Sequence, residues 1–185
     1  MMCGGGKDSL ATSILLEGAG IPCDAMVYSH NIYGQAQRQH DLIDGMLDYT
    51  QAGARHRGWV YDNAVDSPAA RLYPEYGVSH MLSAETVSSY WTTLPIALQH
   101  NHPLVVLGIT SNTDEHNLVW ERTGEAINYL WGMSTTVEKL LDDYIQSELV
   151  RDLNFFHLLR PVYDLVVFNL LPENIEAVPA THSCA

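Results

Sequence analysis

Apolar residues along the chain fall into two kinds of pattern, which together predict an alternation of helices and strands. Helical composition or helical spacing of apolar residues marks four segments: 9–17, 35–51, 85–100 and 135–150. Short apolar runs typical of strands mark three segments: 23–29, 59–61 and 103–109. The segment 68–77 is typical of a loop. Strand–helix alternation at this length predicts an α/β fold, in which a Rossmann-like parallel sheet carries helices on both faces.

The apolar residues of the last predicted helix share one face, which we expect to be buried: Val137, Leu140, Leu141, Tyr144 and Ile145. In open parallel sheets, ligands bind beyond the carboxyl ends of the strands. This rule brings three segments into one region with the loop described next: 27–31, 108–115 and 128–134. We therefore expect the ligand-binding and catalytic residues of the chain to lie in these segments and in the loop.

The segment 3–9, Cys-Gly-Gly-Gly-Lys-Asp-Ser, is the most informative local sequence. Consecutive glycines let a ligand approach the main chain closely, and the following residues predict a helix that Asp8 or Ser9 would cap. A glycine loop that opens a helix directs unpaired N–H groups at one point, where an anion such as phosphate binds. Lys7 adds a positive charge there. An ordinary glycine-rich turn is the alternative reading.

Two common phosphate loops do not fit this segment. A Walker A motif would need a glycine where Met1 stands, and a serine or threonine where Asp8 follows Lys7. The dinucleotide fingerprint would need a glycine at Ser9. The segment must therefore belong to another class if it binds phosphate.

Composition and charge limit the possible partners. The chain has 185 residues, 46% of them hydrophobic and 17% charged, as expected for one globular domain, and it has no apolar run long enough to span a membrane. No signal peptide is visible, and three widely spaced cysteines do not suggest a disulfide framework, so we expect a cytoplasmic protein. With two lysines and a formal charge of −13, nucleic acid is a poor candidate partner. A small anion such as ATP, held by local donors and Mg²⁺, remains compatible with this charge.

The residues Gly4, Gly5, Gly6, Lys7, Asp8 and Ser9 match the pattern Ser-Gly-Gly-x-Asp-Ser, with glycine replacing the leading serine. The segment resembles the PP-loop of the ATP pyrophosphatase superfamily, whose fold is adenine nucleotide alpha-hydrolase-like and whose members cleave ATP to AMP and pyrophosphate. The resemblance implies ATP and Mg²⁺ as cofactors. It implies that the six loop residues, Val27, Tyr28 and Gly108 bind ATP. Its implied catalytic residues are Lys7, Asp8, Asp114 and Glu115, and its implied metal ligands are Asp8 and Asp114.

A narrower resemblance lies in the second half of the chain. The succession from Gly124 through Asn128 and Ser134 to Glu138, followed by Arg160-Pro161 and a terminal His182-Ser183-Cys184, looks like the UDP-N-acetylmuramoyl-L-alanyl-L-glutamate epimerases. Three positions depart from the family pattern, where histidine, glutamine and lysine are replaced by Tyr129, Leu130 and Met133. The resemblance implies a group of substrate-binding residues: Asn128, Tyr129, Ser134, Glu138 and Arg160.

The chemistry implied is activation of a carboxylate by adenylation. The acyl-adenylate is reactive enough for ligation, and its α-carbon is acidic enough for epimerisation by an acid/base pair. The side chains available for that pair near predicted loops are His30, His116, Tyr129 and His157, although surface or helix-face placement is the alternative for each histidine. Arg160 is suited to bind a substrate carboxylate, or else to cap a helix or cover apolar surface.

Both ends of the chain are short compared with the resembled families. Only Met1, Met2 and Cys3 precede the glycine loop, where relatives have an apolar strand, and the chain stops where relatives continue into a cysteine-bearing tail. We expect a single PP-loop domain over residues 1–185 that lacks its first strand and a C-terminal extension. Its partners would be ATP and a small carboxylate, with a homodimer left open.

Three other functions stay open or are disfavoured. A ligase or an amide- or nitrile-forming enzyme, such as a cyano-deazaguanine synthase, belongs to the same superfamily, but those synthases carry a zinc-binding cysteine cluster that this sequence lacks. A non-catalytic adenine-nucleotide-binding module would bind ATP without releasing pyrophosphate. The acidic charge disfavours a tRNA thiolase.

Overall fold

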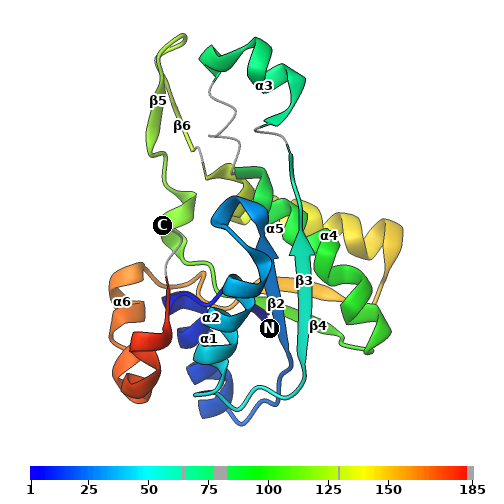
Figure 1. Cartoon of the computed structure of the whole chain (residues 1–185), viewed down its shortest axis with the longest axis vertical. Coiled ribbons are helices and arrows are strands. Elements are labelled where there is room, and N and C mark those ends of the chain that lie inside the picture. The colour runs from blue at the N-terminus through cyan, green and yellow to red at the C-terminus, as the bar shows by residue number, and fades with distance from the viewer. Residues whose placement is uncertain (64–65, 77–82, 129, 183–185) are drawn as a thin grey trace.

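A parallel sheet forms the centre of the computed structural model, which describes residues 1–63, 66–76, 83–128 and 130–182 (Figure 1). Its strands β1 (Met2–Cys3), β2 (Ala25–His30) and β3 (Arg55–Val60) are hydrogen-bonded in the order β1-β2-β3. Cys3 lies opposite Val27, and Val27 lies opposite Arg57. The strand expected to be missing before the glycine loop is therefore present as two residues.

A second parallel pair consists of β4 (Leu104–Leu107) and β7 (Asn154–His157). β4 also contacts β1, so the two parallel units adjoin. The antiparallel hairpin of β5 (Leu118–Trp120) and β6 (Glu125–Ile127) stands apart from both and projects from the body of the molecule, as does the short helix α3 (Pro68–Leu72) (Figure 1).

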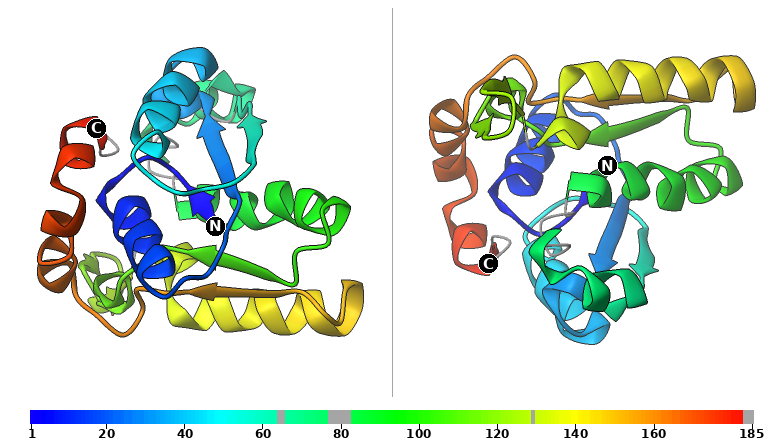
Figure 2. Two further views of the ribbon diagram at one scale, coloured as in Figure 1. Left: turned by 90° about the horizontal axis from the view of Figure 1, so that it is seen from below. Right: turned by 90° about the horizontal axis from the view of Figure 1, so that it is seen from above.

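Helices pack on two sides of these strands (Figure 2). The longer ones are α1 (Lys7–Gly18), α2 (Ala36–Leu47), α4 (Ser83–Gln99) and α5 (Thr135–Tyr144). α5 continues into a π-helical turn at Ile145–Leu149. Short α6 (Asp164–Phe168) precedes a kinked 3₁₀ segment at Leu171–Ala180. Short 3₁₀ turns complete the chain: Asn31–Tyr33, Pro74–Tyr76, Ser111–Asp114 and Trp131–Met133.

The core is divided by the alternation of side chains along the strands. Cys3 and Val106 face a cluster formed with α1, α2 and the 3₁₀ segment Leu171–Ala180. Their neighbours Met2 and Val105 face a second cluster, formed with α4 and the end of α5. Successive residues of a strand point to opposite faces, so helices cover both faces of the sheet. Burial raises the pKa of the Cys3 thiol to about 11, which is typical of an inert core cysteine.

Most of the predicted elements are confirmed. α1, α2, α4 and α5 form in the segments predicted as helices, and β2, β3 and β4 in those predicted as strands. The prediction of a loop over 68–77 is wrong, because Pro68–Leu72 is helical and Pro74–Tyr76 forms a 3₁₀ turn; Gly77 lies outside the described residues. Pro68 opens its helix, where a missing N–H costs nothing and the fixed φ suits the first turn.

The predicted buried face of the last helix is only partly right. Val137 and Ile145 are buried, but Leu140 is 56% exposed and Tyr144 is 50% exposed. The Tyr144 ring instead meets the edge of Trp91 at the surface, with centroids 6.2 Å apart. The helix therefore buries a narrower stripe than its apolar spacing suggests.

Within the described residues, no helix combines the length and the apolar character that a membrane crossing requires.

Candidate functional site

The glycine loop joins the carboxyl end of β1 to the first turn of α1. Gly5 has φ +81°, a conformation that side chains disfavour, and Gly6 is the extended residue that precedes the helix. The prediction that Asp8 or Ser9 caps α1 is therefore wrong. The Ser9 hydroxyl instead accepts a hydrogen bond from the Gly4 N–H at 3.1 Å, which holds the loop against the helix. The N–H groups of the first turn have no partner within the helix by geometry, and this is the arrangement that anion loops use.

Lys7 lies beside two carboxylates at the start of α1. Its Nζ is 2.7 Å from Asp8 Oδ1 and 3.4 Å from Asp164 Oδ1, and it lies over the ring of Phe168, 5.8 Å from the centroid. Burial opposes the charge of Lys7, but the two carboxylates outweigh it and raise its pKa. For Asp8, burial and the nearby Asp164 charge outweigh Lys7 and raise the pKa above the ordinary value. Lys7 is thus held as a cation, paired within the protein.

Gly108, at the end of β4, is packed directly against this region. A Cβ at position 108 would lie 2.7 Å from the Asp8 carbonyl oxygen and 2.6 Å from Thr12 Oγ1. The Thr12 hydroxyl itself donates to that carbonyl at 2.8 Å. The predicted meeting of Gly108 with the glycine loop region is therefore present, through the backbone of Asp8.

The predicted adenine contacts lie in the middle of β2. Val27 is buried and paired on both sides, opposite Cys3 and Arg57. β1 ends opposite Val27, one residue before Tyr28 in β2. The Tyr28 hydroxyl forms a hydrogen bond with Ser88 Oγ at 2.9 Å. Next to it, Ser29 Oγ is buried and has no hydrogen-bond partner among the described residues.

Arg160 is the centre of a polar network that the predicted substrate-binding residues form. Its guanidinium donates to Glu138 Oε2 at 3.1 Å and to Thr113 Oγ1 at 2.8 Å, and lies 3.6 Å from Asp114 Oδ2. It also donates to two carbonyl oxygens, those of Thr110 at 3.1 Å and Met133 at 2.8 Å. With these partners, Arg160 would have to exchange internal hydrogen bonds to bind a substrate carboxylate.

The other predicted residues of the network fix loops around Arg160. Asp114 accepts hydrogen bonds from the N–H and the hydroxyl of Thr135, at 2.6 and 2.5 Å, at the start of α5. The Asn128 amide donates to the Thr113 carbonyl at 2.6 Å, and Ser134 caps α5 by accepting from the Val137 N–H.

The remaining predicted residues take no part in these contacts or lie outside the described structure. Glu115 lies exposed just beyond the 3₁₀ turn Ser111–Asp114. Tyr129 lies outside the described residues.

Two members of this network are titratable, the buried His157 and the partly buried Glu138. Glu138 Oε1 accepts from the backbone N–H of His157 at 2.8 Å, and Glu138 Oε2 lies 3.1 Å from the ring Nδ1 of His157. His157 Nε2 is 2.9 Å from the Tyr90 hydroxyl. Burial disfavours the Glu138 carboxylate, but His157 and Arg160 outweigh it and lower its pKa. Burial also lowers the pKa of His157, helped by the Arg160 charge and opposed by Glu138. The histidine is therefore held neutral beside an ionised glutamate.

The other acid/base candidates lie apart from this network. His30 is buried at the end of β2, where its Nδ1 accepts from the Ile32 N–H at 3.2 Å. His116 is exposed in the loop before β5. Tyr90 is a residue that sequence reasoning did not select, because it lies within an amphipathic helix and looks like an ordinary core aromatic. Burial raises its pKa further above the ordinary value.

His182 is the other residue whose place in the site was not foreseen. The backbone N–H of His182 donates to the Gly5 carbonyl at 3.0 Å. The His182 ring fills the space where a side chain at Gly5 would lie. The Nδ1 atom of His182 is buried and has no hydrogen-bond partner among the described residues. The sequence analysis names His182 only as part of the terminal His-Ser-Cys match to a family pattern. It predicts no contact between His182 and the glycine loop.

No protein-family model matches this chain, and no curated protein matches it at a significant level.

Proposed function

We propose that the chain activates a small carboxylate with ATP, releasing AMP and pyrophosphate. The observation that carries the proposal is the glycine loop at the carboxyl end of β1, with Gly108, the residue directly after β4, packed against the first turn of α1. Phosphate loops of parallel α/β proteins occupy this position, where the end of a strand meets the start of a helix. The geometry agrees with the sequence pattern that first suggested ATP.

The finer fold that we infer is a Rossmann-like, adenine nucleotide alpha-hydrolase-like sheet. Its support is that β3-β2-β1 is parallel, β4-β7 is parallel, and β4 contacts β1, from which we infer the order β3-β2-β1-β4-β7. The strand order then reverses direction between β1 and β4. Ligands of such sheets bind at this switch point, where the glycine loop lies.

The residues around the loop fit a triphosphate. The first-turn N–H groups of α1 can donate to phosphate oxygens, and Lys7 supplies a positive charge. The buried Nδ1 of His182, which has no hydrogen-bond partner among the described residues, supplies a further donor or acceptor beside Gly5. The buried Ser29 hydroxyl, which has no hydrogen-bond partner among the described residues, offers a polar atom for the base on β2, two residues beyond Val27.

Adenylation would proceed by attack of a carboxylate oxygen on the α-phosphorus. The new bond joins that oxygen to phosphorus, the bond from phosphorus to the bridging oxygen breaks, and pyrophosphate leaves with the electron pair. Lys7 and the main-chain donors would stabilise the charge on the transferring oxygens, which is the larger share of such catalysis. Mg²⁺, when bound, would neutralise phosphate charge, and Asp8 and Asp114 are its proposed ligands.

The substrate that the resemblance suggests is UDP-N-acetylmuramoyl-L-alanyl-L-glutamate, whose terminal glutamate would be epimerised after activation. Epimerisation needs an acid and a base on opposite faces of the α-carbon, and Tyr90 and His157 do not supply that pair, because both are buried and hydrogen-bonded to each other. Ligation or amide formation from the same adenylate is the alternative within the superfamily.

The test is pyrophosphate release from ATP and Mg²⁺, with and without the muramoyl dipeptide. The matched pair is Lys7→Ala and Lys139→Ala, since Lys139 is the other lysine and pairs only with Asp143 on the exposed face of α5 among the described contacts. We expect release that depends on the dipeptide, falls at least tenfold in Lys7→Ala and is unchanged in Lys139→Ala. Equal rates in the two lysine variants would contradict the proposal.

One observation favours a second candidate, a non-catalytic nucleotide-binding module. Lys7 is already paired with Asp8 and Asp164, and the His182 ring lies against Gly5. A loop with these contacts could bind a nucleotide without reaching the transferring phosphate. ATP binding without pyrophosphate release from any carboxylate would support this candidate.

A further inference from the structure

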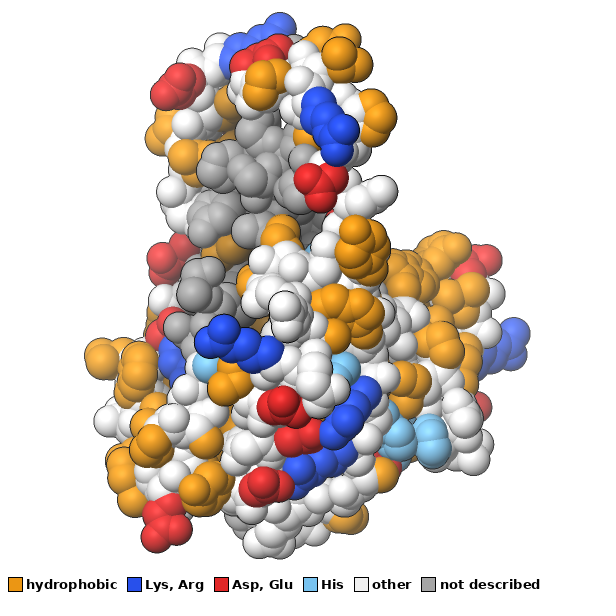
Figure 3. All heavy atoms as spheres, in the orientation of Figure 1, with side chains coloured by type: hydrophobic (Ala, Val, Ile, Leu, Met, Phe, Trp, Pro, Cys, Tyr) orange, Lys and Arg blue, Asp and Glu red, His pale blue; other side chains and the backbone are white. Residues whose placement is uncertain are grey.

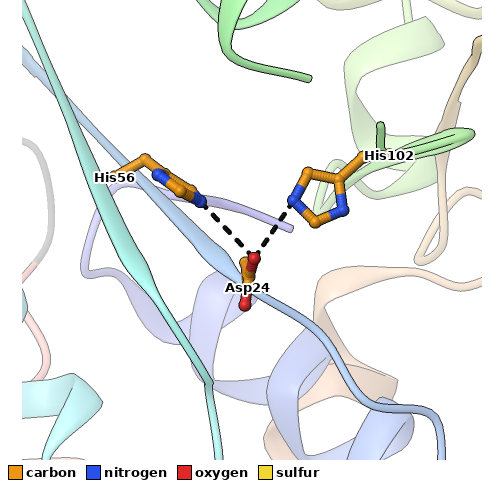
Figure 4. A group of neighbouring side chains, drawn as sticks. All are labelled: Asp24, His56 and His102. Carbon is orange, nitrogen blue, oxygen red and sulfur yellow. Dashed lines mark hydrogen bonds and ion pairs between the residues drawn. The ribbon is translucent and has the colours of Figure 1, made fainter. Parts of the chain in front are cut away.

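A cluster of metal-binding side chains lies at the opposite edge of the sheet from the glycine loop (Figure 4). Asp24 precedes β2, His56 is the second residue of β3, and His102 lies two residues before β4. The amino ends of parallel strands meet at one edge, so three distant parts of the chain bring these side chains together. Both imidazole rings direct a nitrogen at the Asp24 carboxylate (Figure 4).

The distances between the three groups suit a tetrahedral metal ion. Asp24 Oδ2 is 3.4 Å from His56 Nε2 and 3.1 Å from His102 Nε2, and all three atoms lie within 4.8 Å of one another. Ligands at roughly 2.0–2.1 Å from a tetrahedral zinc ion are about 3.3–3.4 Å apart. The ligand atoms therefore need little movement to take up an ion between them.

The carboxylate is held in the orientation that this requires. Asp24 Oδ1 accepts the Ala54 N–H at 2.8 Å, which leaves Oδ2 to the histidines. Gly53 lies directly behind it, since a Cβ at that position would be 2.7 Å from Oδ1. The His100 ring packs on His56 with centroids 4.2 Å apart. Hydrogen bonds that orient ligands in this way are typical of metal sites.

The cluster lies in the wall of a cavity of about 340 Å³. The rest of the wall is mostly apolar and includes Leu16, Ile96, Leu104 and Phe156. Histidine side chains gather on this side of the surface, beside the end of α4 (Figure 3). Water weakens the attraction between a carboxylate and a cation. The apolar wall lowers the local dielectric, so it strengthens the attraction of the Asp24 carboxylate for a cation.

We propose that Asp24, His56 and His102 form a binding site for a divalent transition metal ion, with zinc as the first candidate. Two imidazoles and one carboxylate are a ligand set that zinc and iron(II) use, and three protein ligands leave a coordination position open. That position is available to water or to a small ligand in the cavity. The site is independent of the proposed ATP chemistry, because it lies at the other edge of the sheet.

The test is zinc titration by calorimetry on the full chain without an affinity tag, after removal of metals with a chelator. We expect one equivalent of Zn²⁺ to bind, and we expect Co²⁺ at the same site to give the visible absorption of a tetrahedral ion. His56→Ala, His102→Ala and Asp24→Asn should each weaken zinc binding at least tenfold. Asn keeps an oxygen for the Ala54 N–H, so this variant separates ligation from folding.

His116→Ala is the matched control, since His116 is exposed and far along the chain in the loop before β5. Its zinc affinity should equal that of the wild type, and zinc should raise the melting temperature of both. The cluster variants, checked for folding by circular dichroism, should show no such rise. Failure of the wild type to bind zinc, or wild-type affinity in the His102→Ala variant, would overturn the proposal.

Discussion

Replacing Gly108 with alanine tests the packing that joins β4 to the start of α1. The added methyl group would lie 2.7 Å from the Asp8 carbonyl oxygen and 3.0 Å from the Asp8 carbonyl carbon, both of them backbone atoms. Real Cβ contacts are not this short, and backbone cannot rotate away as a side chain can. Overpacking of this kind costs about 1–3 kcal/mol of unfolding free energy. We expect a loss in that range.

The assay is urea unfolding followed by circular dichroism, with Gly45→Ala as the matched control. Gly45 lies inside α2, and its Cβ would meet nothing within 4 Å. The same substitution there should stabilise the protein by about 0.5–1 kcal/mol, because alanine favours a helix interior. The two variants should thus shift stability in opposite directions. If Gly108→Ala is as stable as the wild type, the reasoning on this contact is refuted.

Three further predictions concern the polar network and the loop. Glu138→Ala should lower the free energy of unfolding in urea by about 3 kcal/mol, because it leaves the Arg160 cation, only 14% exposed, without its nearest carboxylate. A smaller loss of unfolding free energy in Glu138→Ala than in Glu138→Gln would contradict this. The pKa of His157 in the folded protein is below its ordinary 6.5, so on lowering the pH the unfolded chain takes up this proton before the folded protein does. The free energy of unfolding should therefore fall as the pH drops below about 6.5, and His157→Gln should remove this part of the pH dependence. Gly5→Ala should destabilise the chain by at least about 1 kcal/mol, since φ is positive and the new Cβ would lie 2.9 Å from Ile43; an unchanged melting temperature would argue against it.

The sequence predicts the elements whose apolar pattern is strong and local. α2 is an example, because Ile43, Met46 and Leu47 are buried on the side that helical spacing indicates, whereas Leu42, the fourth apolar residue of that pattern, is 42% exposed. β7 was missed, since it is only four residues long and is defined by pairing with β4, about fifty residues earlier. The hairpin of β5 and β6 was missed because its residues are largely exposed, so no alternation of apolar and polar positions marks it.

The candidate site likewise has a part that the sequence predicts and a part that depends on tertiary packing. Asp114, Asn128, Glu138 and Arg160 were selected from a family pattern, and the structure brings them into one network. The sequence does not predict that internal acceptors already take up the hydrogen bonds of the Arg160 guanidinium. Most of these acceptors lie in loops whose paths depend on tertiary packing.

The proposed metal site has a signal in the sequence that is not a motif. Asp24, His56 and His102 have no motif spacing, but each lies at or just before the amino end of a strand. Parallel strands bring those ends together, so the position of each residue relative to its strand predicts the meeting that residue spacing cannot.

The hydrogen bond from His182 to the Gly5 carbonyl has a consequence for the order of folding. It joins residues from nearly opposite ends of the chain, after the segment Leu171–Ala180 has packed against α1 and α2. Contacts between such distant residues carry a large loop-closure cost and form late. We therefore expect α1, β2 and α2 to assemble early from neighbouring sequence, while the glycine loop acquires its final surroundings in the last step. A ligand of that loop would then recognise only chains that have completed folding.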